Sequence, residues 1–323
     1  MNPFSYVPAT DTSSAVALAA GGAKYLAGGT NLVDLMRQGI ETPRELVDIT
    51  RLPLADIEEQ PGGGLRIGAL VRNTRVATDE RIRDRYPVLA QAILNGASPQ
   101  LRNRATVGGN LMQRTRCGYF YDRHSACGKR DPGAGCAALD GFNRTHAILG
   151  TSESCVSVHP SDMCVALAAL DAVVNIAGRD PVPLVDFHRL PGDTPHVETM
   201  LAPGELVTSI DLPPAQPGRS VYLKVRDRAS YAFALVSVAA VVRMEAGRAT
   251  RVRIALGGVA AKPWRAYEAE ELLTGTSLDD ELIHQAAGQA LAGSRQRAHN
   301  AHNAFKAELA RRLIRRALQG VRS

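Results

Sequence analysis

Cysteines are the side chains with the most distinctive chemistry in this sequence, and all five lie between residues 117 and 164. The intervals between them contain 9, 8, 18 and 8 residues. No pair has the C-x-x-C spacing, which disfavours both a thioredoxin-like motif and a zinc ribbon. Disulfides would require an oxidising compartment, and nothing in the sequence indicates export. The spacing therefore favours a metal or cluster site over disulfide bonds.

The segment from Cys117 to Cys136 is rich in glycine, proline and aromatic residues, so it has little capacity to form its own apolar core. Four thiolates on a [4Fe–4S] cluster would hold such a segment in place. Nearby basic residues outnumber acidic ones and would offset the negative charge of a thiolate-bound cluster; solvation of an exposed loop is the alternative explanation. These basic residues are Arg114, Arg116, Arg123, Lys129, Arg130 and Arg144.

The predicted metal ligands are Cys117, Cys127, Cys136 and Cys155. Cys164 lies in the apolar segment MCVALAAL, which predicts a small buried side chain instead. His124 and His146 lie in the same loop and could replace a cysteine, although four cysteines are the favoured set. A zinc-stabilised assembly module without a redox role is a second hypothesis, from a different functional class.

Two glycine turns form the second group of residues with recognisable chemistry. The sequence KYLAGGTNLVDLM places Gly28 and Gly29 between an expected strand and an expected helix. Glycine lets backbone N–H groups approach a ligand closely, and the positive end of the helix dipole would stabilise a phosphate there. The turn at residues 106–110, TVGGN, repeats the pattern. Together they predict a diphosphate held from two sides; two purely structural turns are the competing interpretation.

Other short motifs carry little weight. A G-x-G-x-x-G sequence occurs once, at residues 133–138, but it follows Pro132 rather than a strand and contains Cys136. It is therefore not predicted to bind a nicotinamide dinucleotide. The sequence has no G-x-S-x-G elbow and no H-E-x-x-H motif, so hydrolase and zinc-protease functions have little support.

Strands and helices alternate in the first two thirds of the chain, which predicts an α/β domain. A glycine-rich hairpin turn is expected at residues 62–64, and a helix cap at Ser161 or Asp162. The expected strands are residues 24–27, 45–49 and 65–67. The expected helices are residues 32–38, 81–94 and 163–170.

The sequence DLPPAQPGRS at residues 211–220 contains three prolines and a glycine, and it is the best candidate for a domain boundary. We expect a first domain at residues 1–212, with the cysteine loop inserted at about 113–155, and a smaller α+β domain at residues 220–323. The strands expected in the second domain are residues 232–242 and 252–256.

Helices are expected to follow to the end of the chain. In the last one, residues 304–321, Phe305, Leu309, Leu313 and Leu318 recur at near-helical spacing. The arginines of this segment then occupy the face turned to solvent or to a partner. They are Arg311, Arg312, Arg315 and Arg316.

The composition is typical of a soluble globular protein, with 45% hydrophobic and 22% charged residues among 323. No apolar run reaches the roughly 20 residues that span a bilayer, and the N-terminus lacks export-signal features. We therefore expect a cytoplasmic protein without membrane insertion; export with a signal-bearing partner is the alternative. The net charge is +6, but no aromatic and basic strip suited to nucleic acid occurs.

Taken in order, these motifs resemble the flavoprotein (medium) subunits of the xanthine dehydrogenase and carbon monoxide dehydrogenase class. AGGTNL is followed by TVGGNL, then by HPSD, and later by IALGGV with PWR just after it. Family members without a cluster pass almost directly from GGNL to the Pro-x-Ser-Asp segment, whereas about forty residues intervene here and hold the cysteines. The resemblance is therefore strongest to the flavin subunit of bacterial aldehyde oxidoreductases that carry an additional [4Fe–4S] cluster.

The resemblance implies that FAD contacts both glycine turns. Asp162 would lie on the ribose or adenine side, and Leu206 and Lys224 match positions near the flavin ring. Ser161 is a further implied FAD contact. An aromatic residue often found about ten positions before TVGGN is replaced by Gly96. The implied FAD contacts in the turns are Leu26, Ala27, Gly28, Gly29, Thr30, Asn31, Leu32 and Val33, then Thr106, Gly108, Gly109 and Asn110.

The implied function is electron transfer in a heterotrimeric, molybdenum-dependent aldehyde oxidoreductase. The resemblance implies two partners, a large subunit with the molybdenum cofactor and a small subunit with [2Fe–2S] clusters. FAD and the [4Fe–4S] cluster would be the cofactors of this chain, and none of its residues need act as a general base. The flavin subunit of an aromatic acyl-CoA reductase, which also carries an additional cluster, is the related alternative.

Overall fold

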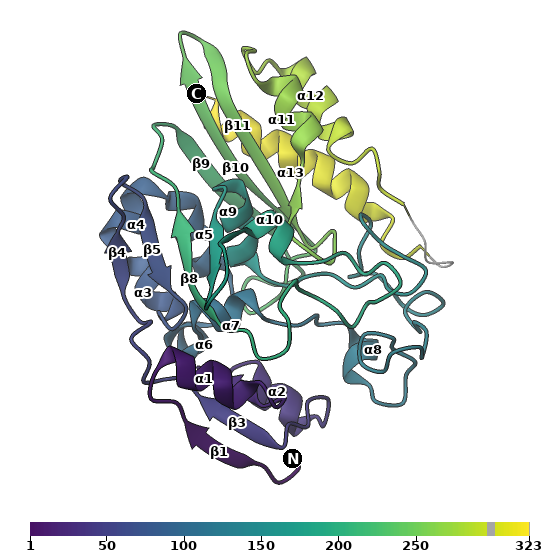
Figure 1. Ribbon diagram of the computed structural model, residues 1–323. Coiled ribbons are helices and arrows are strands. Elements are labelled where there is room, and N and C mark those ends of the chain that lie inside the picture. Colours follow the sequence, from purple (N-terminus) through teal and green to yellow (C-terminus); the bar gives the residue numbers. More distant parts are fainter. Residues whose placement is uncertain (296–300, 323) are drawn as a thin grey trace.

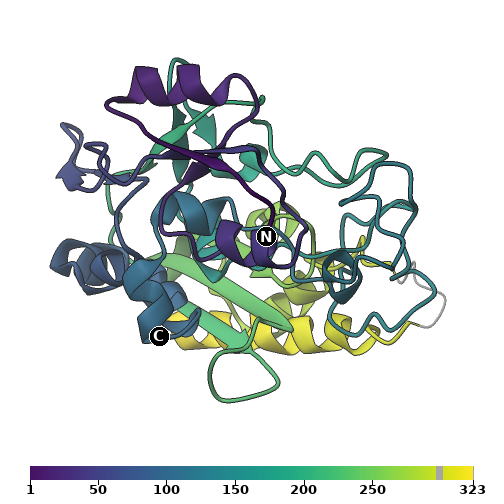
Figure 2. The same cartoon turned by 90° about the horizontal axis from the view of Figure 1, so that it is seen from below.

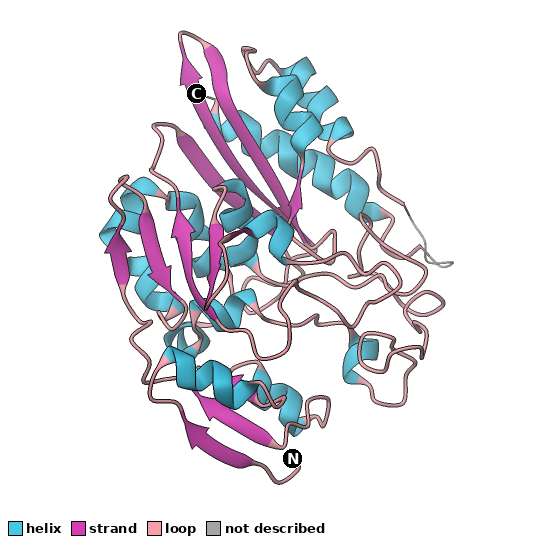
Figure 3. Ribbon diagram, in the orientation of Figure 1, coloured by secondary structure: helices cyan, strands magenta, loops and turns pink. Residues whose placement is uncertain are grey.

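The computed structural model describes residues 1–295 and 301–322, which form three β-sheets with helices packed around them (Figure 1). This mixed α/β architecture agrees with the expected fold class. Figure 3 shows that loops without regular structure form a large region to one side of the sheets. Among the described residues, no helix has the length and apolar character needed to cross a membrane.

A small parallel sheet begins the chain. Its strands are β1 (Ser5–Pro8), β2 (Lys24–Leu26) and β3 (Glu45–Asp48), in the order β1-β3-β2. Helices α1 (Thr12–Ala19) and α2 (Leu32–Arg37) accompany it. The strand predicted at residues 24–27 and the helix predicted at 32–38 are confirmed to within a residue. α2 ends just before Gly39, whose φ of +68° suits glycine after a helix.

A five-stranded antiparallel sheet lies at the centre of the molecule (Figure 1). β4 and β5 form the hairpin predicted at residues 62–64, and β5 pairs with the distant β8. The order is β4-β5-β8-β6-β7. The strands are β4 (Ile57–Glu59), β5 (Leu65–Gly68), β6 (Val173–Ile176), β7 (Val182–Pro183) and β8 (Val207–Leu212).

Short helices connect and cover the central sheet. The single helix predicted over residues 81–94 is wrong, because α4 ends at Arg85 and a new helix starts at Pro87. Proline has no N–H to continue the helix but suits a first helical position. The cap predicted at Ser161 is confirmed, since its hydroxyl accepts the Cys164 N–H at 3.1 Å. The helices are α3 (Asn73–Thr78), α4 (Glu80–Arg85), α5 (Pro87–Asn95), α6 (Pro99–Arg104), α7 (Val107–Leu111), α9 (Asp162–Ala169) and α10 (Leu184–Phe187).

A four-stranded antiparallel sheet forms the C-terminal part, with three helices on one face (Figure 1). Its order is β12-β11-β10-β9. The strands are β9 (Arg219–Val225), β10 (Val236–Glu245), β11 (Arg248–Gly257) and β12 (Trp264–Arg265), and the helices are α11 (Tyr267–Leu273), α12 (Asp280–Gln289) and α13 (Phe305–Val321).

Both faces of β10 are buried. Val238, Ala240 and Val242 belong to the core beneath the C-terminal helices, whereas Ala239 belongs to the core of the central sheet. Burial on two sides explains why the sequence of this strand is a nearly continuous apolar run. The strand predicted at residues 232–242 is shifted, because it begins only at Val236, after a loop in which Tyr231 has a φ of +51°. β9 was not predicted.

The expected amphipathic pattern of α13 is partly wrong at its start. Phe305 is 37% exposed, while Lys306 is fully buried. The Lys306 ammonium is satisfied because it donates to the carbonyl oxygens of Thr145, His146 and Gly258, at 2.9, 2.8 and 2.6 Å. The side chain of Arg312 is 74% exposed, in agreement with the predicted basic face.

The cysteine loop between α7 and α9 contains one short helix, α8 (Gly118–Tyr121). It lies to one side of the sheets, near the start of α13 (Figure 2). The guanidinium of Arg130 holds the loop together by donating to four carbonyl oxygens. The side chain of Arg130 is only 8% exposed. Polar contacts to backbone oxygens therefore replace much of the apolar core that this segment lacks. The four oxygens belong to Tyr119, Phe120, Asp122 and Ser125.

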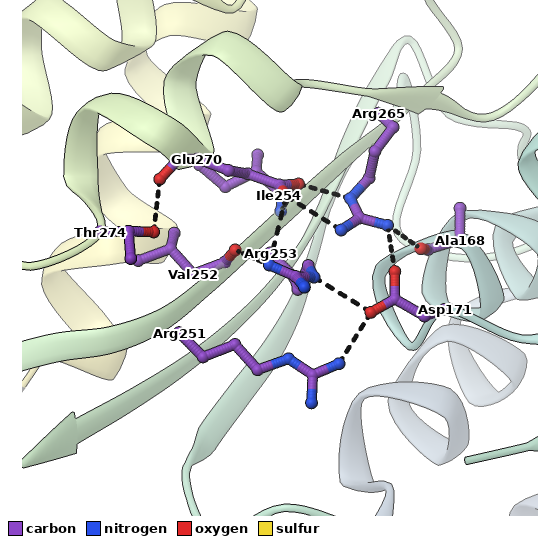
Figure 4. A network of polar contacts seen from close by, with 9 residues as sticks. All are labelled: Ala168, Asp171, Arg251, Val252, Arg253, Ile254, Arg265, Glu270 and Thr274. Carbon is purple, nitrogen blue, oxygen red and sulfur yellow. Dashed lines mark hydrogen bonds and ion pairs between the residues drawn. The ribbon is translucent and has the colours of Figure 1, made fainter.

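A network of charges ties the C-terminal sheet to the end of α9 (Figure 4). Asp171 accepts from Arg251 at 2.7 Å and from Arg253 at 3.0 Å. Arg265 donates to Asp171 and to the Ala168 carbonyl, both at 2.7 Å. Its other side binds Glu270, which also accepts the N–H of Ile254 at 2.8 Å. The network thus joins β11, β12 and α11 to the central layer.

Glu270→Gln tests how much this network contributes to the free energy of unfolding. The substitution leaves the guanidinium of Arg265, whose side chain is 4% exposed, without its buried carboxylate. Since Asp171 remains as a partner, we expect the free energy of unfolding to fall by about 3 kcal/mol, near the lower bound for breaking a buried pair. Urea denaturation of the full chain measures this change.

Glu308→Gln is the matched control, because Glu308 pairs with Arg311 and Arg312 on an exposed helix face. Its effect on the free energy of unfolding should be negligible beside that of Glu270→Gln, because water screens an exposed ion pair. Equal costs for the two variants would show that the buried network does not hold the two layers together.

Candidate functional site

The two glycine turns lie side by side although 78 residues separate Asn31 from Gly109. The Asn31 side-chain amide donates to the Gly109 carbonyl at 2.9 Å, and Arg104 donates through Nε to the Gly28 carbonyl at 3.2 Å. A Cβ on Gly28 would stand 2.3 Å from the Arg104 carbonyl oxygen. Gly28 is therefore required by the close packing of the chain on itself.

The first turn has free backbone donors. Gly29 has a φ of +76°, which favours glycine over other residues. Within the described parts of the chain, the N–H groups of Gly29, Thr30 and Asn31 have no acceptor. They border a cavity of about 620 Å³. Unpaired amides at a cavity wall form an anion-binding concavity.

The second turn differs from the first, contrary to the expectation of two equivalent amide cradles. The N–H groups of Val107 and Gly108 donate to the carbonyls of Val71 and Ala69 at 2.9 and 2.8 Å. Those of Gly109 and Asn110 are bonded within the turn, to Thr106. This turn therefore supplies a wall and a scaffold, while the free donors belong to the first turn.

The HPSD segment is bonded to the second turn. The Ser161 hydroxyl donates to the Asn110 side-chain oxygen at 2.7 Å. Asp162 pairs with Lys224 at 2.7 Å and accepts from the Tyr222 hydroxyl at 2.5 Å. The side chain of Lys224 is only 1% exposed, and it also donates to the Asn95 carbonyl. Asp162 and Lys224, both predicted to bind the cofactor, thus form an ion pair with each other.

A second cavity of about 210 Å³ adjoins the first. Thr115, Val158 and His159 line both of them. Asp162 lies at the wall of the second cavity, and Phe233, which is 50% exposed, faces it from the C-terminal part of the chain. Phe233 was not predicted, since a single aromatic residue in a loop carries no spacing signal.

The predicted cofactor residues divide into a lining group and a supporting group. Ala27, Gly28, Gly29, Thr30, Asn31, Leu32, Thr106 and Gly109 line the first cavity, and Ser161 and Asp162 line the second. Leu26, Val33, Gly108, Asn110, Leu206 and Lys224 lie behind these residues and are not part of either lining. Leu206 is buried in the core of the N-terminal layer.

The four predicted cysteine ligands surround one enclosed space, which Cys164 does not line. All are free thiols, and an isolated antiparallel bridge holds Cys127 opposite Cys136. Burial raises the pKa of the Cys117 thiol to about 12 and also raises the pKa of Cys136. Deprotonating Cys117 and Cys136 therefore requires a positively charged partner, because thiolates are the metal-binding form.

His146 also borders the cysteine space, with Nε2 at 3.1 Å from Cys117 Sγ. Burial lowers the pKa of His146 to about 4, so the imidazole is neutral at physiological pH. His124 is exposed and does not line the space. Of the two histidines considered as substitute ligands, the structure therefore brings only His146 to the cysteines.

The cysteine space shares its walls with both cavities. Thr115, Lys129 and Ser157 line it as well as the first cavity. Cys117 and His146 line it as well as the second. Single side chains therefore separate the sulfurs from the space beside the glycine turns.

Comparison with known proteins assigns the family. Residues 2–215 match the FAD binding domain in molybdopterin dehydrogenase, and residues 221–321 match the CO dehydrogenase flavoprotein C-terminal domain. The chain belongs to the FAD-binding subunits of the molybdenum hydroxylase family. The resemblance and the fold class inferred from the sequence are thereby confirmed, and FAD is the cofactor of the matched domain.

Relatives extend over almost the whole length of this flavoprotein. It is 52% identical to the aldehyde oxidoreductase FAD-binding subunit PaoB of Escherichia coli K12, over 94% of this chain and 92% of that protein. It is 25% identical to the carbon monoxide dehydrogenase medium chain of Afipia carboxidovorans, over 82% and 76%. A structure of carbon monoxide dehydrogenase from Hydrogenophaga pseudoflava matches with a TM-score of 0.77 and 27% identity, covering 99% of this chain and 97% of that one.

Gly28→Ala tests the packing of the two turns in this flavoprotein. The new methyl group would overlap the Arg104 carbonyl oxygen, so the turns must separate. We expect the free energy of unfolding to fall by about 1–3 kcal/mol, together with a lower flavin content after purification. Absorption at the flavin bands and urea denaturation measure the two effects.

Gly21→Ala is the control for this prediction, because a Cβ there meets nothing within 4 Å. It should retain both flavin and stability. A Gly28→Ala protein with the full flavin content would contradict the tight contact between the turns.

Stability should depend on pH through the buried His188. Burial lowers its pKa from 6.5 to about 4, and its Nε2 lies 3.0 Å from the Leu111 carbonyl oxygen. Between these two pH values the unfolded chain binds a proton that the folded chain does not, so stability falls as pH falls. One such histidine contributes a slope of up to about 1.4 kcal/mol per pH unit.

His188→Gln should therefore flatten the dependence of unfolding free energy on pH in this window. Urea denaturation at a series of pH values measures the slope. Equal slopes for the variant and the wild type would show that His188 is accessible to protons in the folded state.

Proposed function

We propose that this chain is the FAD- and [4Fe–4S]-carrying electron-transfer subunit of a heterotrimeric, molybdenum-dependent aldehyde oxidoreductase. A large subunit would oxidise aldehydes at its molybdenum cofactor, and a small subunit would pass the electrons through [2Fe–2S] clusters to this chain. An external acceptor would then receive them. The observation that carries the proposal is the common wall between the glycine-turn cavities and the space surrounded by four cysteines.

The first glycine turn is the proposed seat of the FAD diphosphate, because its three unpaired N–H groups face the larger cavity. Tyr25 and Gly204 line the same cavity, and we assign the adenosine to their side. The isoalloxazine ring would extend past His159 into the second cavity, beside Phe233 and Asp162.

A multi-iron cluster fits the cysteine space better than a single zinc ion. Four thiolates on zinc, at Zn–S distances of about 2.3 Å, would bring their sulfurs within about 3.8 Å of one another. Among the described residues, no three of the four cysteine sulfurs lie within 4.8 Å of one another. The iron–sulfide core of such a cluster is cationic before the four thiolates bind it, and it would keep these cysteines deprotonated.

The shared walls support a relay between the two cofactors. Bound FAD supplies the ability to accept electrons singly and to release them in pairs. Lys129 sits on the wall between the cysteine space and the first cavity, where it pairs with Glu198 at 2.8 Å. Arg114 binds the same Glu198 at 2.6 Å and also Glu41 at 2.7 Å. These residues would fix the loop that separates the cofactors and balance its charge.

The assignment to aldehydes rests on the 52% identity to the FAD-binding subunit of an aldehyde oxidoreductase. The substrate would bind on the large subunit, so this chain's own task is to hold its cofactors and to dock the partners. Location in the cytoplasm, with co-export as the alternative, stays a prediction from the sequence.

Cofactor content tests the proposal directly. The full chain, purified without air, should show flavin absorption bands and contain about four iron atoms and acid-labile sulfide. Stoichiometric zinc in a colourless protein would overturn the proposal. Cys127→Ser should lose most of the iron, because one of four ligands is removed.

Cys164→Ser is the matched control, since this thiol is fully buried in α9 and does not line the cysteine space. It should keep the iron. In the complete complex, unchanged aldehyde turnover by Cys127→Ala with a lower melting temperature would reject the relay and leave the cluster a structural role.

A further inference from the structure

Arg116 links the cysteine loop to the first glycine turn. It directly precedes Cys117, and it lines the second cavity. The guanidinium donates to the Asn31 side-chain oxygen and, at 2.8 Å, to the Tyr121 hydroxyl. A residue next to a proposed cluster ligand thus holds a residue of the proposed diphosphate site.

The contact with Asn31 sets the orientation of that side chain. Because Arg116 occupies the amide oxygen, the amide nitrogen must point the other way, and it donates to the Gly109 carbonyl. Asn31 is also one of the three residues of the first turn with an unpaired backbone N–H. Movement of Arg116 would therefore disturb both the free donors and the bond between the two turns.

Arg116 also borders the second cavity. Its guanidinium carbon lies 5.2 Å from the ring centre of Phe233, in cation–π contact. Its Nε is buried and has no hydrogen-bond partner among the described residues.

We propose that Arg116 is a positioning residue that couples occupancy of the cysteine site to the affinity for FAD. This inference rests on the proposed function. With four cysteines bound to the cluster, Cys117 is fixed, and Arg116 holds Asn31 in the orientation that presents the first turn to the diphosphate. Without the cluster, Cys117 is no longer fixed, and Arg116 no longer holds Asn31 of the first turn in place. Flavin would then be retained best by chains that have already assembled their cluster.

Coupling of this kind is reciprocal, because two ligands that favour the same conformation strengthen each other by the same factor. FAD should therefore also protect the cluster. This consequence can be measured on the wild-type chain alone, without any substitution.

The experiment measures the FAD dissociation constant of the full chain in cluster-loaded and cluster-free forms, by quenching of flavin fluorescence. In the wild type, removal of the cluster should raise the constant on the order of tenfold. Arg116→Gln should bind FAD as weakly as the cluster-free wild type, and cluster removal should change its affinity no further. FAD should also slow iron loss to a chelator in the wild type but not in the variant.

Arg123→Gln is the matched control, because it removes the same charge from an exposed position of the same loop. It should keep the full difference between the two forms. Asn31→Ala breaks the same contact from the other side and should also abolish the coupling, which provides a second test if Arg116→Gln does not fold.

The outcomes separate the two proposals. Equal FAD affinity of both wild-type forms, or undiminished coupling in Arg116→Gln and Asn31→Ala, overturns the role of Arg116 and leaves the proposed function intact. A chain that binds no FAD in either form, or that assembles no cluster, overturns the proposed function and the coupling with it.

Discussion

The hydrogen bond from the Asn31 side chain to the Gly109 carbonyl is the contact on which the cofactor region depends. It joins two turns that are far apart in sequence and belong to different layers of the fold. Together with the contacts from Arg104 to Gly28 and from Arg116 to Asn31, it holds the first turn with three unpaired N–H groups at a cavity wall. These half-buried N–H groups are left free for the acceptors of a ligand in the first cavity.

The cysteine loop is also held together by hydrogen bonds to backbone carbonyl oxygens. It has too few apolar residues for a core, apart from the small cluster around Phe120. Arg130 and Lys306 compensate, since each buried cation is surrounded by backbone carbonyl oxygens. Burial lowers the pKa of Lys306 to about 7, which shows how costly its charge is in that position. Cations directed at carbonyls therefore take the place of apolar packing.

The sequence predicted the parts of the site that are encoded by local chemistry. The glycine turns, the strand and helix around the first of them, and the four cysteines that share one space all follow from residue types and spacing. It did not predict which turn has free amides, because that depends on the carbonyls of Val71 and Ala69, which come from another part of the chain. The pairing of Asp162 with Lys224 was missed for the same reason, since β9 brings the lysine from the C-terminal sheet.

The errors at element boundaries have equally specific causes. The helical periodicity across residues 81–94 is real, but a single proline divides the segment into two helices that pack into the same core. In β10 the apolar run starts before the strand does, because residues just before Val236 belong to a loop that faces the second cavity. Phe305 and Lys306 exchange their expected positions because three carbonyl oxygens make burial of the lysine favourable.

The charges around the second cavity also change the interpretation of Lys224. Its ammonium lies 2.7 Å from the buried carboxylate of Asp162, so the pair is neutral as a unit. Arg116 is compensated far less, because its nearest carboxylate, Asp34, is 3.7 Å away and has 46% of its side chain exposed. Water screens such a pair, whereas a buried pair is screened little. The lining of the second cavity therefore contains one arginine whose charge is only weakly compensated, Arg116, and the same residue holds Asn31.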